Sequence, residues 1–162
     1  MTFVNYYHLS LALSAAFDTI DHNILIERLK NMYGIDSTAL NWFRSYLSNR
    51  TQSVLVEDSV SKELPMSYGV PQGSKLGPIL FNSYIAPLSG IAHKHGVDDE
   101  KYADDEQLYL SFKPRLPNDG SDAVVRIENC IEEIRQFLQQ NKLCNNSEKT
   151  EFLIIGTPQQ LK

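Results

Sequence analysis

The acidic stretch from Asp98 to Glu106 constrains the fold more than any other part of this chain. It holds six carboxylates and one Lys within nine residues, and such a cluster repels itself unless a cation lies within it. Adjacent acids often mark only a solvated turn. Here the residues after Glu106 alternate as in a strand, with Leu108 and Leu110 on one face. The pattern favours a β-hairpin with Asp104 and Asp105 at a metal-bearing tip.

The hydrophobic periodicity elsewhere predicts an α+β fold. Leu9, Leu11 and Leu13 alternate with small residues, which predicts a half-buried strand whose second face has room for a ligand. Helical spacing predicts helices over 23–33, 37–49, 78–87 and 119–138, and further strands are predicted at 51–57 and 151–155. In the second helix, Trp42 falls among core positions. The order of elements predicts an antiparallel sheet backed by helices on one face.

A glycine-rich segment, Gly69 to Pro78, carries three glycines and two prolines in ten residues. This composition predicts a tight loop that leads into a helix at Pro78, so backbone N–H groups at 74–76 would face an anion. An ordinary Gly-Pro connection explains the segment equally well.

Composition restricts the class of protein. With 162 residues and 42% hydrophobic content, we expect a single domain over 1–162 with its core at 9–156. The net charge of −5 argues against binding of nucleic acid by bulk attraction alone. Cys130 and Cys144 lack metal-ligand spacing, so we expect two reduced thiols. The sequence has no secretory signal and no apolar run of membrane-spanning length, which predicts an intracellular protein.

Four segments in this order resemble the reverse transcriptase of non-LTR (LINE-type) retrotransposons. They are Leu11 to His22, Gly69 to Asn82, Tyr102 to Asp105, and Asn141 to Leu153. Together they span most of residues 9–156, and the ordered set is far more specific than any one segment. The resemblance implies a polymerase palm-like sheet and RNA-templated DNA synthesis by two-metal nucleotidyl transfer. It also implies an RNA template, a DNA primer, deoxynucleoside triphosphates and Mg²⁺.

The resemblance further implies a role for individual residues. Asp104 and Asp105 would bind metal and act in catalysis. Lys149 matches a position suspected of protonating pyrophosphate, although a surface Lys beside two Glu residues is an equal interpretation. Phe17 would exclude a ribose 2′-hydroxyl, whereas a core Phe is the alternative. The implied nucleotide-binding positions are Leu13, Phe17, Pro71, Gln72 and Gly73.

One departure from the family pattern falls on the central metal ligand. Family members carry Asp where this chain has Ala12, and a methyl group cannot coordinate Mg²⁺. Asp18 is a poor substitute because it lies six residues further along the chain. Only eleven residues precede Ala12, so we expect the fingers and the thumb to be largely missing. The sequence therefore predicts a truncated, catalytically impaired retroelement remnant.

Two alternatives remain open at this point. One is a non-catalytic nucleic-acid or protein-binding module that reuses the palm surface. The other is a metal-dependent phosphohydrolase built on the acidic cluster. The second leaves the glycine-rich loop and the order of the four segments unexplained.

Overall fold

The protein divides into two compact units in the computed structural model. Unit 1 comprises Met1–Ala16 and Ile85–Lys162, and unit 2 comprises Phe17–Tyr84. The structure describes residues 5–102, 105–113, 119–146 and 148–156. Within these ranges, none of the helices combines the length and apolar character that a bilayer span requires.

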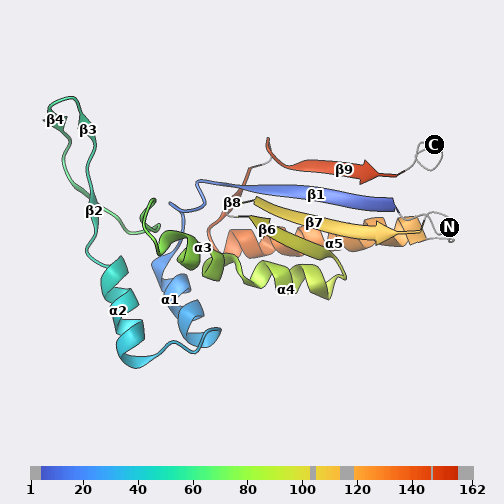
Figure 1. Ribbon diagram of the computed structural model, residues 1–162, viewed down its shortest axis with the longest axis horizontal. Helices are drawn as coiled ribbons and strands as arrows, with labels where there is room; N and C mark the ends of the chain where they lie inside the picture. Colours follow the sequence, from blue (N-terminus) through green and yellow to red (C-terminus); the bar gives the residue numbers. More distant parts are fainter. Residues whose placement is uncertain (1–4, 103–104, 114–118, 147, 157–162) are drawn as a thin grey trace. The chain divides into compact units, whose positions relative to one another are not determined.

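Unit 1 is built on a five-stranded antiparallel sheet. Its strands are β1 (Asn5–Ser14), β6 (Asp98–Tyr102), β7 (Asp105–Phe112), β8 (Cys144–Asn145) and β9 (Glu151–Ile155). The strand order is β6-β7-β1-β8, and β9 pairs with β1 as well. The helices α4 (Pro87–Lys94) and α5 (Asp119–Gln140) lie on the same face of this sheet (Figure 1). The prediction of an α+β fold with helices on one face of an antiparallel sheet is confirmed.

Alternation along the strands explains why one face of the sheet is buried. Leu9 and Leu11 of β1 and Leu108 of β7 point towards α5, where Ile127 and Ile134 meet them in the core. Each of these five side chains is at most 5% exposed. Complete burial of such a side chain contributes about 1.5–3 kcal/mol, so this face accounts for much of the unit's stability.

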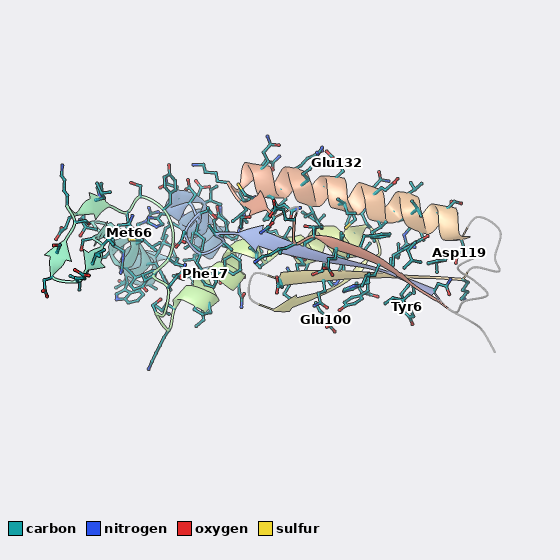
Figure 2. All side chains as sticks on the ribbon, turned by 90° about the horizontal axis from the view of Figure 1, so that it is seen from above. Tyr6, Phe17, Met66, Glu100, Asp119 and Glu132 are labelled. Carbon is teal, nitrogen blue, oxygen red and sulfur yellow. The ribbon has the colours of Figure 1, made fainter. Side chains whose placement is uncertain are left out.

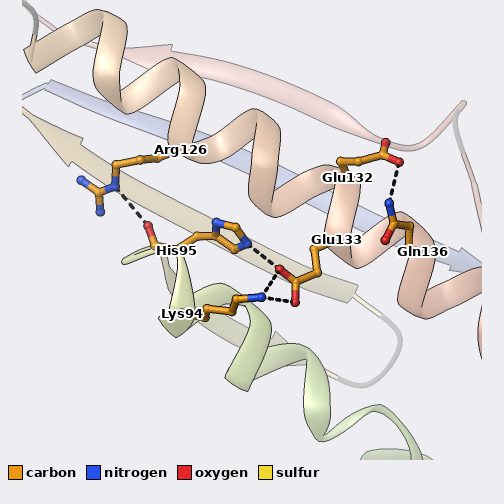
Figure 3. Close-up of polar contacts among 6 residues, drawn as sticks. All are labelled: Lys94, His95, Arg126, Glu132, Glu133 and Gln136. Carbon is orange, nitrogen blue, oxygen red and sulfur yellow. Dashed lines mark hydrogen bonds and ion pairs between the residues drawn. The ribbon is translucent and has the colours of Figure 1, made fainter.

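Polar contacts fix the end of α4 against α5 (Figure 3). Lys94 and His95 both contact the carboxylate of Glu133, at 2.8 Å from Nζ and 2.7 Å from Nε2. The Nε of Arg126 donates to the carbonyl oxygen of His95 at 3.0 Å. Hydrogen bonds from Lys94 and His95 lower the pKa of Glu133. These contacts hold α4 and α5 together on the covered side of the sheet.

Unit 2 contains three helices and an arm of four short strands. The helices are α1 (His22–Asn31), α2 (Ser37–Leu47) and α3 (Gly77–Ile85). Asp21 caps α1 by accepting from the N–H groups of Asn23 and Ile24, and such a cap stabilises a helix by about 1 kcal/mol. The arm consists of β2 (Thr51–Gln52), β3 (Leu55–Val56), β4 (Ser59–Val60) and β5 (Leu64–Pro65) (Figure 1). Its strands pair as β2 with β5 and β3 with β4.

Two expectations for unit 2 are wrong. Trp42 was expected in the core, but it is 52% exposed, because α2 buries the face that carries Leu40 and Leu47 instead. At two residues after Leu40, Trp42 points to another side of the helix and stacks on Tyr46. The continuous strand expected over 51–57 is two short strands, which pair with different partners in the arm.

The other face of the unit 1 sheet carries polar and aromatic side chains. Tyr6 and Glu100 lie on the side opposite α5 (Figure 2). His8 of β1 stacks on Tyr109 of β7, with ring centroids 4.9 Å apart. Along β9, the four apolar residues 152–155 are each 47–53% exposed. Among the described strands, β9 pairs only with β1, so its outer edge is open.

Candidate functional site

The sheet register brings Ala12 and Asp105 directly opposite one another. The two residues are antiparallel partners at the end of the β1–β7 ladder. Directly opposed residues share one face of a sheet, with Cβ atoms about 4.5–5.5 Å apart. Ala12 is 6% exposed and Asp105 is exposed. The register therefore places Asp105 opposite position 12, where the resemblance implies a metal-binding Asp.

The described residues do not complete a metal site. Asp104 lies outside the described residues, so its predicted position cannot be compared. In the part of the chain that the structure describes, no three His, Cys, Asp or Glu side chains are grouped to hold a metal ion. Opposite Asp105 there is only the methyl group of Ala12. Among the described residues, position 12 therefore offers no oxygen ligand to Mg²⁺, which requires convergent oxygen ligands.

Two other predicted site residues belong to the same unit. Leu13 follows Ala12, is 9% exposed, and pairs with Asn145 of β8. Lys149 is exposed in the turn between β8 and β9, and its backbone N–H donates to the carbonyl oxygen of Asn146 at 3.2 Å. The N–H of Asn146 in turn donates to the carbonyl oxygen of Ala12 at 2.8 Å. The Lys149 turn is thus tied to the end of β1.

The remaining predicted residues lie in unit 2, where the glycine-rich loop folds against the segment that begins at Phe17. The ring of Phe17 stacks on Phe81 of α3 with centroids 4.8 Å apart, and its carbonyl oxygen accepts from the N–H of Val70 at 2.9 Å. An added Cβ at Gly69 would lie 3.0 Å from the backbone of Asp18. Gly69 also has a φ of +86°, so this close approach requires glycine.

Within the loop, each predicted nucleotide-binding residue has a distinct environment. The carbonyl oxygen of Pro71 accepts from the hydroxyl of Ser74 at 2.7 Å, and that hydroxyl accepts from the N–H of Gly77 at 3.0 Å. Gly73 has a φ of +77°, and an added Cβ there would meet no atom within 4 Å. Gln72 is exposed. The loop therefore holds Pro71 firmly and leaves Gly73 facing open space.

The sequence did not reveal that Asp18 is the partner of Gln72. The Nε2 of Gln72 lies 3.2 Å from both carboxylate oxygens of Asp18. His22 contacts the carbonyl oxygen of Gly69 at 2.7 Å through its Nε2. No local pattern in the sequence specifies the pair of Asp18 and Gln72, because the two residues are 54 positions apart. Asp18 therefore contacts the glycine-rich loop within unit 2.

Glu106 is buried beneath the sheet, next to the acidic tip. Its side chain is 5% exposed, and Lys101 Nζ lies 3.8 Å from its Oε1. Neither carboxylate oxygen accepts a hydrogen bond from any described residue. Burial raises the pKa of Glu106 to about 7, Lys101 opposes this shift, and Asp99 adds to it. Alternation along β7 is the sequence feature that could have indicated this burial, because Glu106 shares its face with Leu108.

Comparison with known families decides the identity of the fold. The sequence model of the family described as "Reverse transcriptase (RNA-dependent DNA polymerase)" matches residues 5–162. The chain belongs to this reverse transcriptase family. Its curated relatives are polymerases of non-LTR retrotransposons, so it is a reverse transcriptase domain of the LINE type.

Three of these relatives come from insects. "Probable RNA-directed DNA polymerase from transposon BS" of Drosophila melanogaster is 36% identical over 61% of this chain and 11% of its own length. "RNA-directed DNA polymerase from mobile element jockey" of the same organism is 27% identical over 86% and 15%. "Retrovirus-related Pol polyprotein from type-1 retrotransposable element R2" of Popillia japonica is 33% identical over 51% and 12%. The reverse transcriptase chain thus spans 11–15% of these relatives.

Solved telomerases share the fold of this reverse transcriptase chain. Telomerase from Candida tropicalis in complex with a fragment of telomeric RNA gives a TM-score of 0.73 at 14% identity, over 94% of this chain and 26% of that chain. Telomerase from Candida albicans, also with a telomeric RNA fragment, gives 0.65 at 14% identity over 91% and 28%. At this identity the likeness shows the fold alone.

Proposed function

We propose that this chain is a catalytically impaired reverse transcriptase domain, in which Ala12 occupies the position of a lost metal-binding Asp. The observation that carries the proposal is the register of Ala12 with Asp105. A carboxylate at position 12 would lie on the same face as Asp105, within reach of a shared cation. With a methyl group at position 12, the proposed ligands Asp104 and Asp105 lack this additional carboxylate.

The expected impairment is severe. Reverse transcriptases generally use divalent metal ions, which stabilise the charge that develops on the transferring phosphoryl group. Removing a group that stabilises such charge typically costs a factor of about 100–1,000 in rate. A ligand shared by both ions affects two such interactions, so we expect a larger loss.

The family supports a nucleic-acid template as partner. In our proposal the template is RNA, the primer is DNA and the incoming substrates are deoxynucleoside triphosphates. Phe17 and the loop residues Pro71, Gln72 and Gly73 would contact the nucleotide, together with Leu13. Lys149 would supply a proton to the leaving pyrophosphate. These residues are proposed site positions, and the metal proposed for Asp104 and Asp105 is Mg²⁺.

The test is primer extension on an RNA template by the full chain and its Ala12→Asp variant, with Mg²⁺ or Mn²⁺. We expect synthesis by Ala12→Asp at least about 100-fold above the parent chain. Ser10→Asp is the matched control, because it places a carboxylate on the same face of β1 but opposite Gln107. This control is expected to gain nothing.

Robust synthesis by the unaltered chain would refute the proposed impairment. Equal gains from Ala12→Asp and Ser10→Asp would show that position 12 has no special place in the site. Saturable, metal-independent RNA binding without synthesis by either variant would favour the alternative of a non-catalytic binding module.

A further inference from the structure

A small pocket in unit 2 lies at the base of the arm. Its volume is about 230 Å³, and it is lined by Asp18, Gln52, Pro65, Met66, Ser67 and Tyr68. Sites for drug-sized molecules measure about 300–1,000 Å³, so this pocket suits a single ring system. We propose that it binds one unpaired guanine base, which deepens the proposed function by giving the RNA strand a contact of its own.

Backbone contacts hold the walls of the pocket in place. Pro65 pairs with Thr51 across the base of the arm, and the N–H of Met66 donates to the carbonyl oxygen of Arg50 at 2.8 Å. On the opposite wall, Tyr68 forms an antiparallel bridge with Asp21. Because the pocket is built by the backbone on two sides, a ligand need not order it first.

The charge of the pocket selects against phosphate. Asp18 is its only formally charged lining residue, and none of the six is a cation. A carboxylate repels a phosphate group, but it accepts hydrogen bonds from the N–H edge of a base. The polar rim of Asp18, Gln52 and Ser67 is therefore suited to the edge of a base rather than to the sugar-phosphate backbone.

Guanine matches the carboxylate best among the four bases. Its neighbouring N1–H and N2–H groups are two adjacent donors that can meet both oxygens of one carboxylate. The Nε2 of Gln72 lies 3.2 Å from both oxygens of Asp18, on the side of the carboxylate where a base edge would bind both, so guanine would take the place of this exposed amide. Before the base binds, Gln72 holds the Asp18 carboxylate in one orientation.

The remaining walls suit the flat face of a base. Tyr68 is 51% exposed, which leaves area for stacking, and Met66 beside it is half-buried. Figure 2 labels Met66 in the segment that follows the arm. Proteins recognise unpaired RNA bases by this combination of aromatic stacking and hydrogen bonds to the base edge.

The test is an NMR titration of the ¹⁵N-labelled full chain with GMP, AMP, CMP and UMP. We expect GMP to shift the amide signals of Gln52, Met66, Ser67 and Tyr68 saturably, and to bind at least about tenfold more tightly than UMP. Asp18→Asn should weaken GMP binding at least about tenfold. The matched control Asp58→Asn changes an exposed acid in the turn of the arm and should leave the affinity unchanged.

Two further variants separate the pocket from its surroundings. Tyr68→Leu should weaken GMP binding about tenfold through lost stacking, whereas Tyr33→Leu, at another exposed Tyr of unit 2, should not. If Asp18→Asn disturbs signals throughout unit 2, Tyr68→Leu carries the test. Equal affinity for all four nucleotides, or unaltered GMP binding by Tyr68→Leu, would overturn the proposal.

A second experiment identifies whether the base comes from RNA or from a free nucleotide. A uridine oligonucleotide with one central guanosine should bind more tightly than both GMP and the all-uridine oligonucleotide. If GMP binds and the oligonucleotide does not, the ligand is a free nucleotide and the proposed RNA contact is wrong. Neither measurement needs synthesis, so failure here is distinguishable from failure of the proposed function.

Discussion

Restoring the carboxylate at position 12 provides a stability test of the proposed site that requires no activity. In Ala12→Asp, a charge is buried at a position that is 6% exposed and lies opposite Asp105. Two unit charges about 5 Å apart repel by about 3 kcal/mol at an effective dielectric constant near 20, and by less than 1 kcal/mol in water. Desolvation of the new carboxylate adds to this cost.

We therefore expect Ala12→Asp to lower the free energy of unfolding by about 2–4 kcal/mol in EDTA. For a chain of 162 residues, this corresponds to a decrease in Tm of roughly 5–15 °C. A divalent ion that binds only the folded state at 100 times its Kd returns about 2.7 kcal/mol. Saturating Mn²⁺ or Mg²⁺ should therefore recover most of the loss.

The assay is thermal unfolding followed by circular dichroism, with and without the metal, for the parent chain, Ala12→Asp and Ser10→Asp. Ser10→Asp faces Gln107 on β7 and Glu151 on β9, so it should also lower stability in EDTA, but metal should restore less of its loss because this position lacks Asp105 as a partner. Adding Asp105→Asn to Ala12→Asp should recover part of the loss in EDTA. Equal melting of the parent and Ala12→Asp in EDTA, or equal rescue of both Asp variants by metal, would refute the reasoning.

Three further predictions concern single side chains. The pKa of Glu106 is about 7 in the folded state and 4.5 ordinarily, so the free energy of unfolding should fall as the pH rises from 4.5 to 7. In urea unfolding, Glu106→Gln should raise this free energy by about 1–3 kcal/mol at pH 8 and change it little at pH 4.5. Burial raises the pKa of Cys130 to about 11, so iodoacetamide at pH 8 should label exposed Cys144 first, and Cys144→Ser should abolish the fast phase. Glu57 has a φ of 53° in the turn of the arm, so Glu57→Gly should stabilise the arm by about 0.5–1 kcal/mol. The measurement is hydrogen exchange at the Ser61 N–H, which donates to the carbonyl oxygen of Val54 and should exchange several-fold more slowly.

Short-range patterns in the sequence were sufficient for the sheet and its covered face. Alternation predicted the buried sides of β1 and β7, because neighbouring residues of a strand point to opposite faces whatever lies beyond them. Helical spacing alone did not predict the exposure of Trp42, since the buried side of α2 depends on where its neighbours pack. The arm was missed because its short strands carry little periodicity.

The candidate site was predicted from resemblance rather than from spacing. Nothing local in the sequence aligns Ala12 with Asp105, because strand register depends on the whole ladder. The contact between Asp18 and Gln72 joins residues 54 positions apart, and no periodic pattern encodes such a pair. The inward position of Glu106 was not predicted, and its raised pKa depends on burial, with Lys101 and Asp99 of the neighbouring strand acting in opposite directions.

The open edge of β9 has a consequence for handling this protein at high concentration. Four consecutive apolar residues, without proline or an interrupting charge, lie beside a strand edge with which no other described strand pairs. Such a segment can template intermolecular β-sheet. Fibrils or inclusion bodies would then grow from this strand in an otherwise native molecule. A lysine in place of Leu153 would act as a gatekeeper residue and improve the yield of soluble material.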